Sequence, residues 1–107
     1  LNVVQVRELI GSGEKNIAKG ELHEAMQALR SAFEGANNLS NARLQAESGL
    51  LLGKVLVRLD QFTEALEILR TSVKALPEGA SHKGILQSLN RMLVDAYRGA
   101  GDLPMSA

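Results

Sequence analysis

A short stretch of the sequence recurs in outline three times. Residues 59–65, Leu-Asp-Gln-Phe-Thr-Glu-Ala, have counterparts at 19–25, Lys-Gly-Glu-Leu-His-Glu-Ala, and at 100–106, Ala-Gly-Asp-Leu-Pro-Met-Ser. Leu22, Phe62 and Leu103 are equivalent in these stretches, so the offsets are 40 and 41 residues. A period between about 20 and 50 residues is typical of stacked repeats, which bury their apolar faces against neighbours and leave one surface free for a partner. The repetition therefore predicts a repeat array that holds another molecule.

Between these stretches the apolar residues recur at steps of three or four, and no segment alternates with period two for long enough to suggest a strand. This spacing predicts five helices, over residues 2–19, 21–35, 41–59, 63–76 and 81–99. Gly35 and Pro77 are expected to end the second and fourth helices, and Ser81 to cap the fifth. Residues 50–57 are apolar on nearly every side, which predicts a central, buried helix. Pro104 stands where a sixth helix would begin.

The links between these helices are short, which makes neighbouring helices antiparallel. We therefore expect an all-α fold, an antiparallel helix-turn-helix array of about two and a half repeats. Residues 1–107 would form a single domain, and the start at Leu1 suggests a fragment of a longer protein.

Composition narrows the classes of partner. Twelve basic and twelve acidic residues cancel, and such a balance argues against nucleic-acid and anionic-membrane binding. No apolar run reaches the roughly 18 residues of a membrane span. The chain has no cysteine, so disulfides and thiolate metal sites are excluded.

The second of the three repeat units, which contains the stretch 59–65, has small and large apolar residues and a proline at a recognisable spacing. They are Leu52, Gly53, Leu56, Phe62, Ala65, Leu69 and Pro77. In this spacing the chain resembles the tetratricopeptide repeat, although its period is longer than usual for that family. The resemblance implies that Gly53 and Ala65 are small residues facing each other where the two helices of a repeat cross. It implies that Phe62 fills the gap between those helices.

The other two units carry the pattern less completely. The matching positions are Gly13, Leu22 and Ala25 in the first unit and Tyr97 and Leu103 in the third, where Val94 replaces the small residue. Long repeats of this kind are similar to those of bacterial regulatory proteins, where the array commonly precedes a signalling output domain. The resemblance thus implies a cytoplasmic regulatory module.

The resemblance also implies which residues line the partner-binding face, because the first helix of each pair forms the inner surface. The charged positions carried over are Arg7, Glu14, Glu47, Lys54, Arg58, Arg91, Asp95 and Arg98. Five of these are basic and three acidic, which makes this face mildly basic. The alternative is a solvated face in which Asp95 pairs with Arg91 and Arg98. Ile10 and Glu14 stand where arrays that grip a peptide's terminal carboxylate carry Lys and Asn, which argues against that binding mode.

The sequence contains no convincing pattern of catalytic or metal-binding residues. His23 lacks a second ligand three or four residues away, and His82 lies in a link. Ser81, His82 and Asp95 lack the strained turn that activates a serine nucleophile. We therefore expect no enzyme activity, catalytic residue, metal or cofactor.

The favoured function is a protein-interaction or regulatory scaffold module that binds a partner peptide or helix on the inner face. Two alternatives stay open. One is a small-ligand sensor with a pocket between the inner helices. The other is self-association into a homodimer, because the fifth helix carries more apolar residues than its neighbours would cover: Ile85, Leu86, Leu89, Met92, Leu93, Ala96 and Tyr97.

Overall fold

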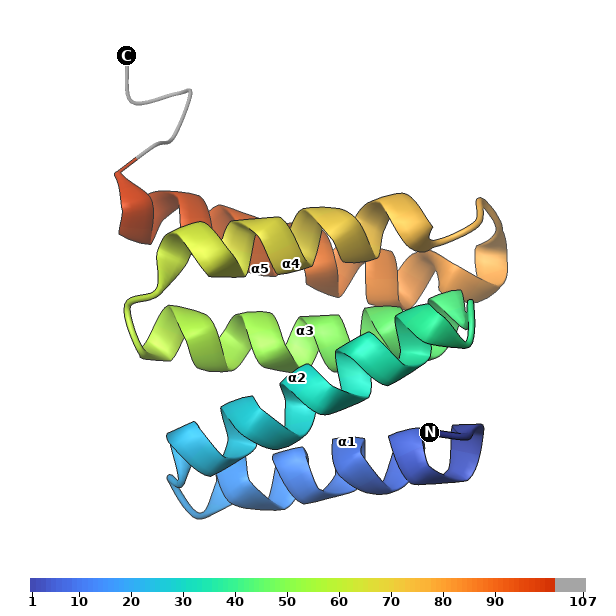
Figure 1. Cartoon of the computed structure of the whole chain (residues 1–107). Coiled ribbons are helices and arrows are strands. Elements are labelled where there is room, and N and C mark those ends of the chain that lie inside the picture. Colours follow the sequence, from blue (N-terminus) through green and yellow to red (C-terminus); the bar gives the residue numbers. More distant parts are fainter. Residues whose placement is uncertain (102–107) are drawn as a thin grey trace.

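Five α-helices follow one another along residues 1–101, the part of the chain that the computed structural model describes (Figure 1). They are α1 (Val3–Ala18), α2 (Leu22–Asn38), α3 (Ala42–Arg58), α4 (Phe62–Ala75) and α5 (Lys83–Ala100). A short 3₁₀ turn, η1 (Ala80–His82), precedes α5, and the described part contains no strand. The expected all-α fold with five consecutively packed helices is confirmed. Leu103 and the start of a sixth helix at Pro104 lie outside the described residues.

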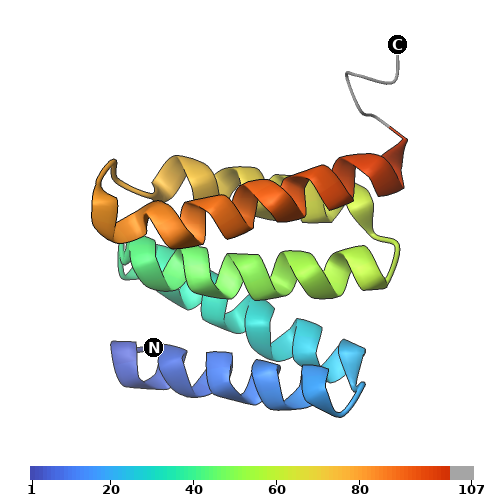
Figure 2. The ribbon, with the colours of Figure 1, turned by 180° about the vertical axis from the view of Figure 1, so that it is seen from behind.

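The helices form two layers. Helices α1, α3 and α5 lie side by side and run in the same direction, while α2 and α4 lie behind them with the opposite direction (Figure 2). Helix α3 packs against all four of the other helices. This position explains the apolar run at residues 50–57, because α3 is buried on several sides, with Leu52, Val55 and Leu56 fully enclosed.

The first three turns share one conformation. Gly20, Ser40 and Asp60 each adopt a left-handed backbone, with φ of 78°, 53° and 59°. Each following amide donates back across the turn, Glu21 to the Asn16 carbonyl at 2.8 Å and Gln61 to the Leu56 carbonyl at 2.8 Å. This is the Schellman closure of a helix C-terminus. Equal turns joining helices of similar length produce the regular stacking.

Helix starts are fixed by two asparagines. The Asn2 side chain accepts from the Gln5 amide at 2.9 Å, and the Gln5 side chain accepts from the Asn2 amide, which forms a capping box. Asn41 accepts from the Leu44 amide at 3.0 Å. The expected cap at Ser81 is wrong, because Ser81 lies inside η1 and α5 begins after His82 without a side-chain cap.

Two glycines inside helices make room for a neighbouring segment. Helix α2 continues three residues beyond Gly35, which is buried where α1 crosses α2, close to Leu1 and Val6. Gly99 lies in α5, and its missing side chain leaves room for the Phe62 ring. Gly35 was expected to end the second helix, whereas it permits the close approach of α1, and Gly99 makes room for Phe62.

The repeat period is visible in the packing of small residues. A side chain on Gly13 would meet Leu29, and one on Gly53 would meet Leu69 at 2.6 Å. Both residues of this contact recur 40 residues later. The atoms nearest to a side chain placed on Gly53 belong to Leu69, whereas the expected partner was Ala65. Ala65 and Ala25, its counterpart in the first unit, are both fully buried.

Candidate interaction surface

Two adjoining hollows lie on the layer formed by α1, α3 and α5, here called the inner face. The α1–α3 hollow holds about 260 Å³ and is lined by Ile10, Glu14, Glu47, Leu50, Leu51 and Ile85. The α3–α5 hollow holds about 220 Å³ and is lined by Leu50, Leu51, Lys54, Ser88, Arg91, Met92 and Asp95. Leu50 and Leu51 belong to both linings, so the two hollows adjoin each other at α3, and together they are here called the depression.

Five of the eight charged residues expected on this face line the hollows: Glu14, Glu47, Lys54, Arg91 and Asp95. The other three, Arg7, Arg58 and Arg98, are exposed on the same helices but line neither hollow. The helices that position these residues run in the same direction at an offset of 40 or 41 residues. Glu14, Lys54 and Asp95 therefore stand at equivalent levels of α1, α3 and α5.

The floor of the depression is apolar and partly open to solvent. It consists of Ile10, Leu50, Leu51, Met92 and the nearly buried Ile85. The sequence analysis placed Ile10 and Leu50 on this face but counted Ile85 and Met92 among the apolar residues of α5 that its neighbours would leave uncovered. Apolar periodicity alone does not separate a core residue from a floor residue, because both lie on the side of the helix that faces its neighbours.

Most charges around the depression are unpaired. Within residues 1–101 the ion pairs are Arg30–Glu64 at 2.6 Å, between α2 and α4, and Arg43–Glu47 at 3.6 Å, within α3. The alternative pairing of Asp95 with Arg91 and Arg98 is therefore wrong. Lys54, Arg91 and Glu14 likewise make no ion pair with a described residue.

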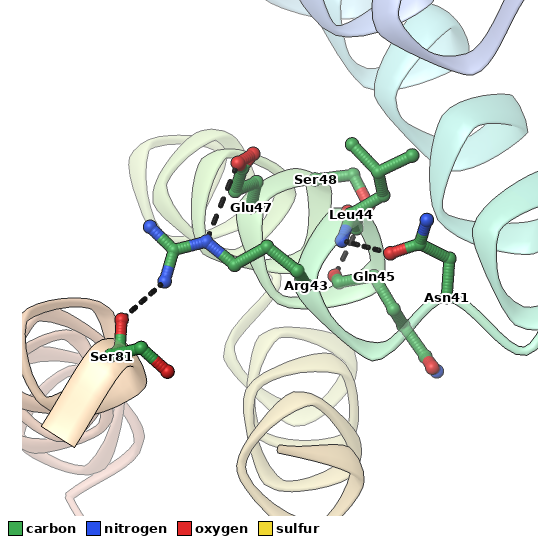
Figure 3. Close-up of polar contacts among 7 residues, drawn as sticks. All are labelled: Asn41, Arg43, Leu44, Gln45, Glu47, Ser48 and Ser81. Atoms are coloured by element: carbon green, nitrogen blue, oxygen red, sulfur yellow. Dashed lines mark hydrogen bonds and ion pairs between the residues drawn. The ribbon is translucent and has the colours of Figure 1, made fainter. Parts of the chain in front are cut away.

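Arg43 fixes one edge of the inner face (Figure 3). Its guanidinium lies 3.6 Å from the Glu47 carboxylate and donates to the Ser81 carbonyl at 3.2 Å. This contact ties the start of α3 to the turn that precedes α5. In the same region the Ser48 hydroxyl donates to the Leu44 carbonyl at 2.8 Å, so this buried polar group is satisfied within α3.

The apolar residues of α5 are turned inward, contrary to the premise for self-association. Ile85, Leu89 and Ala96 are buried, and Met92, Leu93 and Tyr97 pack against the same core. Tyr97 also accepts hydrogen bonds from Arg70 of α4, whose guanidinium carbon lies 5.1 Å from the ring centroid. The physical reason is that α5 packs on α3 and α4 together. Only Val94, 42 % exposed, is an open large apolar residue on this helix.

The histidines and acidic residues of the described part of the chain lie apart from one another as possible metal ligands. No group of three or more His, Asp or Glu in residues 1–101 is arranged to hold a metal ion. His23 is exposed, and His82 is partly buried with a buried Nδ1 that has no hydrogen-bond partner among the described residues. None of the described helices has the length and hydropathy needed to cross a membrane.

The chain was compared with protein-family models, with curated proteins and with solved structures. No match was found in any of the three comparisons.

Proposed function

We propose that this chain is a protein-interaction module that binds a partner on the inner face. The observation that supports this most directly is the depression across α1, α3 and α5, with its apolar floor and unpaired charged rim. An apolar centre surrounded by polar residues is the usual arrangement of a protein–protein interface. Charges without partners, such as Lys54 and Arg91, are available to a bound protein.

A macromolecular partner fits this surface better than a small ligand. Small-molecule sites are typically enclosed cavities of about 300–1,000 Å³, whereas the two hollows hold about 220 and 260 Å³ and lie open on the surface. A side chain of a partner fills a hollow of this size. Self-association through α5 has no comparable support, because most of the apolar stripe of that helix packs against α3 and α4.

The resemblance to long tetratricopeptide repeats supports the same proposal at the level of the whole protein. We propose that the array is a regulatory scaffold without enzyme activity of its own. As in the bacterial proteins it resembles, it would be attached to a signalling output domain in the cytoplasm.

The test is a selection of binders from a displayed library of 20-residue peptides, followed by a steric block of the inner face. Ser88 lines the α3–α5 hollow, and its hydroxyl bonds only the Gly84 carbonyl of its own helix. Ser88→Tyr should therefore fill the hollow and weaken the selected binders at least tenfold. Thr71→Tyr, on the exposed side of α4, is the matched control and should leave affinity unchanged. Loss of binding in the control alone, or the absence of any binder, would contradict the proposal.

A further inference from the structure

We infer that the segment bound on the inner face is an amphipathic helix of a partner protein that carries charges of opposite sign at its two ends. Its basic side chain would lie over the α1–α3 hollow and its acidic side chain over the α3–α5 hollow. This inference rests on the proposed function and specifies the chemistry of the partner.

The two hollows differ in charge. The α1–α3 hollow is lined by two carboxylates, Glu14 and Glu47, and by no basic residue. The Glu47 carboxylate forms an ion pair with the Arg43 guanidinium at 3.6 Å, while Glu14 has no ion-pair partner among residues 1–101. The α3–α5 hollow is lined by two bases, Lys54 and Arg91, and one acid, Asp95. Charges at the rim of an interface select partners of complementary charge and set their register.

The chemistry of the floor favours a helix over an extended peptide. The backbone of an extended segment needs hydrogen-bond partners wherever it loses water. The floor offers aliphatic side chains and Met92, and the helices beneath it use their backbone groups internally. Ser88, the neutral polar residue of the lining, already donates to Gly84 at 3.2 Å. A helix satisfies its own backbone and places only side chains on such a floor.

Helix geometry gives the spacing of the side chains that reach the hollows. Packed helices lie about 8–10 Å apart. One hollow lies between α1 and α3 and the other between α3 and α5, so the distance between the two hollows should be similar. Residues seven apart in a helix are about 10.5 Å apart along its axis and share a face. The bound helix should therefore cross the three inner helices with apolar anchors at i and i+7. A third apolar residue, at i+3 or i+4, would lie on Leu50 and Leu51, which both hollows share.

The experiment uses three synthetic 18-residue peptides with the same three leucines at i, i+4 and i+7. The mixed peptide carries Lys beside the first anchor and Glu beside the last, and the other two carry only Lys or only Glu at those positions. Fluorescence anisotropy at low ionic strength gives the affinity of each peptide for the protein. The mixed peptide should bind at least tenfold more tightly than either other peptide, and salt should reduce this preference.

Charge reversal in the protein should change the preferred peptide. Lys54→Glu with Arg91→Glu makes both hollows acidic, so the all-Lys peptide should become the tightest binder. Arg91→Glu alone, at an exposed residue, is a second variant that does not disturb the half-buried Lys54. Glu67→Lys with Lys74→Glu reverses two exposed charges on α4 and should leave the order of the peptides unchanged.

Helical binding is tested with the mixed peptide in which the residue at i+5 is replaced by proline. Proline interrupts the helix while keeping every anchor and charge, so its affinity should fall at least tenfold. Equal affinity of the proline peptide, no preference among the three peptides, or no binding of any of them would overturn the inference. The proposed function would survive these outcomes as long as library-selected binders remain sensitive to Ser88→Tyr. Binders insensitive to Ser88→Tyr would overturn both.

Discussion

At the scale of single residues, the glycines of this chain serve opposite purposes. A side chain on Gly53 would overlap Leu69, and one on Gly13 would overlap Leu29. Gly11 and Gly84 also lie within helices, yet a side chain there would have no heavy atom within 4 Å. The first two allow neighbouring helices to approach closely, whereas the other two make room for no neighbouring segment.

Gly53→Ala should therefore destabilise the fold. Forcing a methyl group into this contact should cost roughly 1–3 kcal/mol of the free energy of unfolding. Gly84→Ala is the control and should stabilise the protein by roughly 0.5–1 kcal/mol, because alanine loses less backbone entropy in a helix. Urea unfolding followed by circular dichroism measures both. Equal effects of the two substitutions would show that Gly53 is not at a close helix crossing.

The residues with left-handed backbone conformation in the turns can also be tested by substitution. Ser40 has φ of 53° and a side chain, whereas Gly20 occupies the equivalent turn position without one. Ser40→Gly should raise the unfolding free energy by about 0.5–1 kcal/mol, because this conformation costs an L-residue roughly 1–2 kcal/mol and glycine loses part of that gain in the unfolded chain. Gly20→Ser should have the opposite effect in thermal unfolding. A stabilising Gly20→Ser would contradict the assigned turn conformation.

At the scale of elements, α5 packs on α3 and α4, and a close contact at its C-terminal end adds to this packing. The Phe62 ring, at the first residue of α4, lies against Gly99 in the last turn of α5. At its other end, α5 is tied to α3 by the Arg43 contact with Ser81. The helix is thus held at both ends, which keeps the α3–α5 hollow in register.

Gly99→Ala should loosen the C-terminal end of α5, because its new methyl group would occupy the space of the Phe62 ring. We expect a loss of roughly 1–3 kcal/mol and faster amide exchange in the last turn of α5. Gly84→Ala, in the first turn of the same helix, is again the control. Unchanged stability of Gly99→Ala would show that Phe62 moves aside without consequence.

At the scale of the whole molecule, the array is centred on α3, and its α5 end is largely polar. Gln87, Asn90 and Val94 of α5 stand 41 residues after Ala46, Gly49 and Gly53, which are buried in α3. The outward stripe of α5 thus carries large or polar side chains where α3 carries small ones. It offers little apolar surface for stacking a second copy, so binding is expected on the inner face instead.

Amide hydrogen exchange should follow this arrangement. Helix α3 contacts the other four helices, whereas α1 contacts only α2 and α3. Local opening is easiest where few buried contacts are lost, so the slowest amides should belong to α3 and the faster ones to α1 and the last turn of α5. Exchange measured by NMR, residue by residue, checks this order. Slowest exchange in α1 would contradict the assignment of α3 as the centre of the array.

Much of the fold follows from local chemistry in the sequence. Apolar spacing placed all five helices to within three residues at each end, because an amphipathic helix needs its stripe wherever it packs. The offset between Leu22 and Phe62 gave the repeat period, and the run at residues 50–57 identified the central helix. Five of the eight expected charged residues line the hollows.

Tertiary structure decided the features that depend on what lies opposite a residue. A glycine can stand in a turn or at a helix crossing, so the sequence alone did not show that Gly35 lies inside α2 against Leu1 and Val6, or that Gly99 makes room for Phe62. Likewise, the apolar pattern of α5 does not show how much of that helix is covered by α3 and α4. The pairing of Lys54, Arg91 and Asp95 depends on distances between side chains that spacing does not fix. The sequence by itself determined the helices and their repeat, because these depend on near neighbours in the chain, whereas burial, close contacts and unpaired charge depend on distant ones.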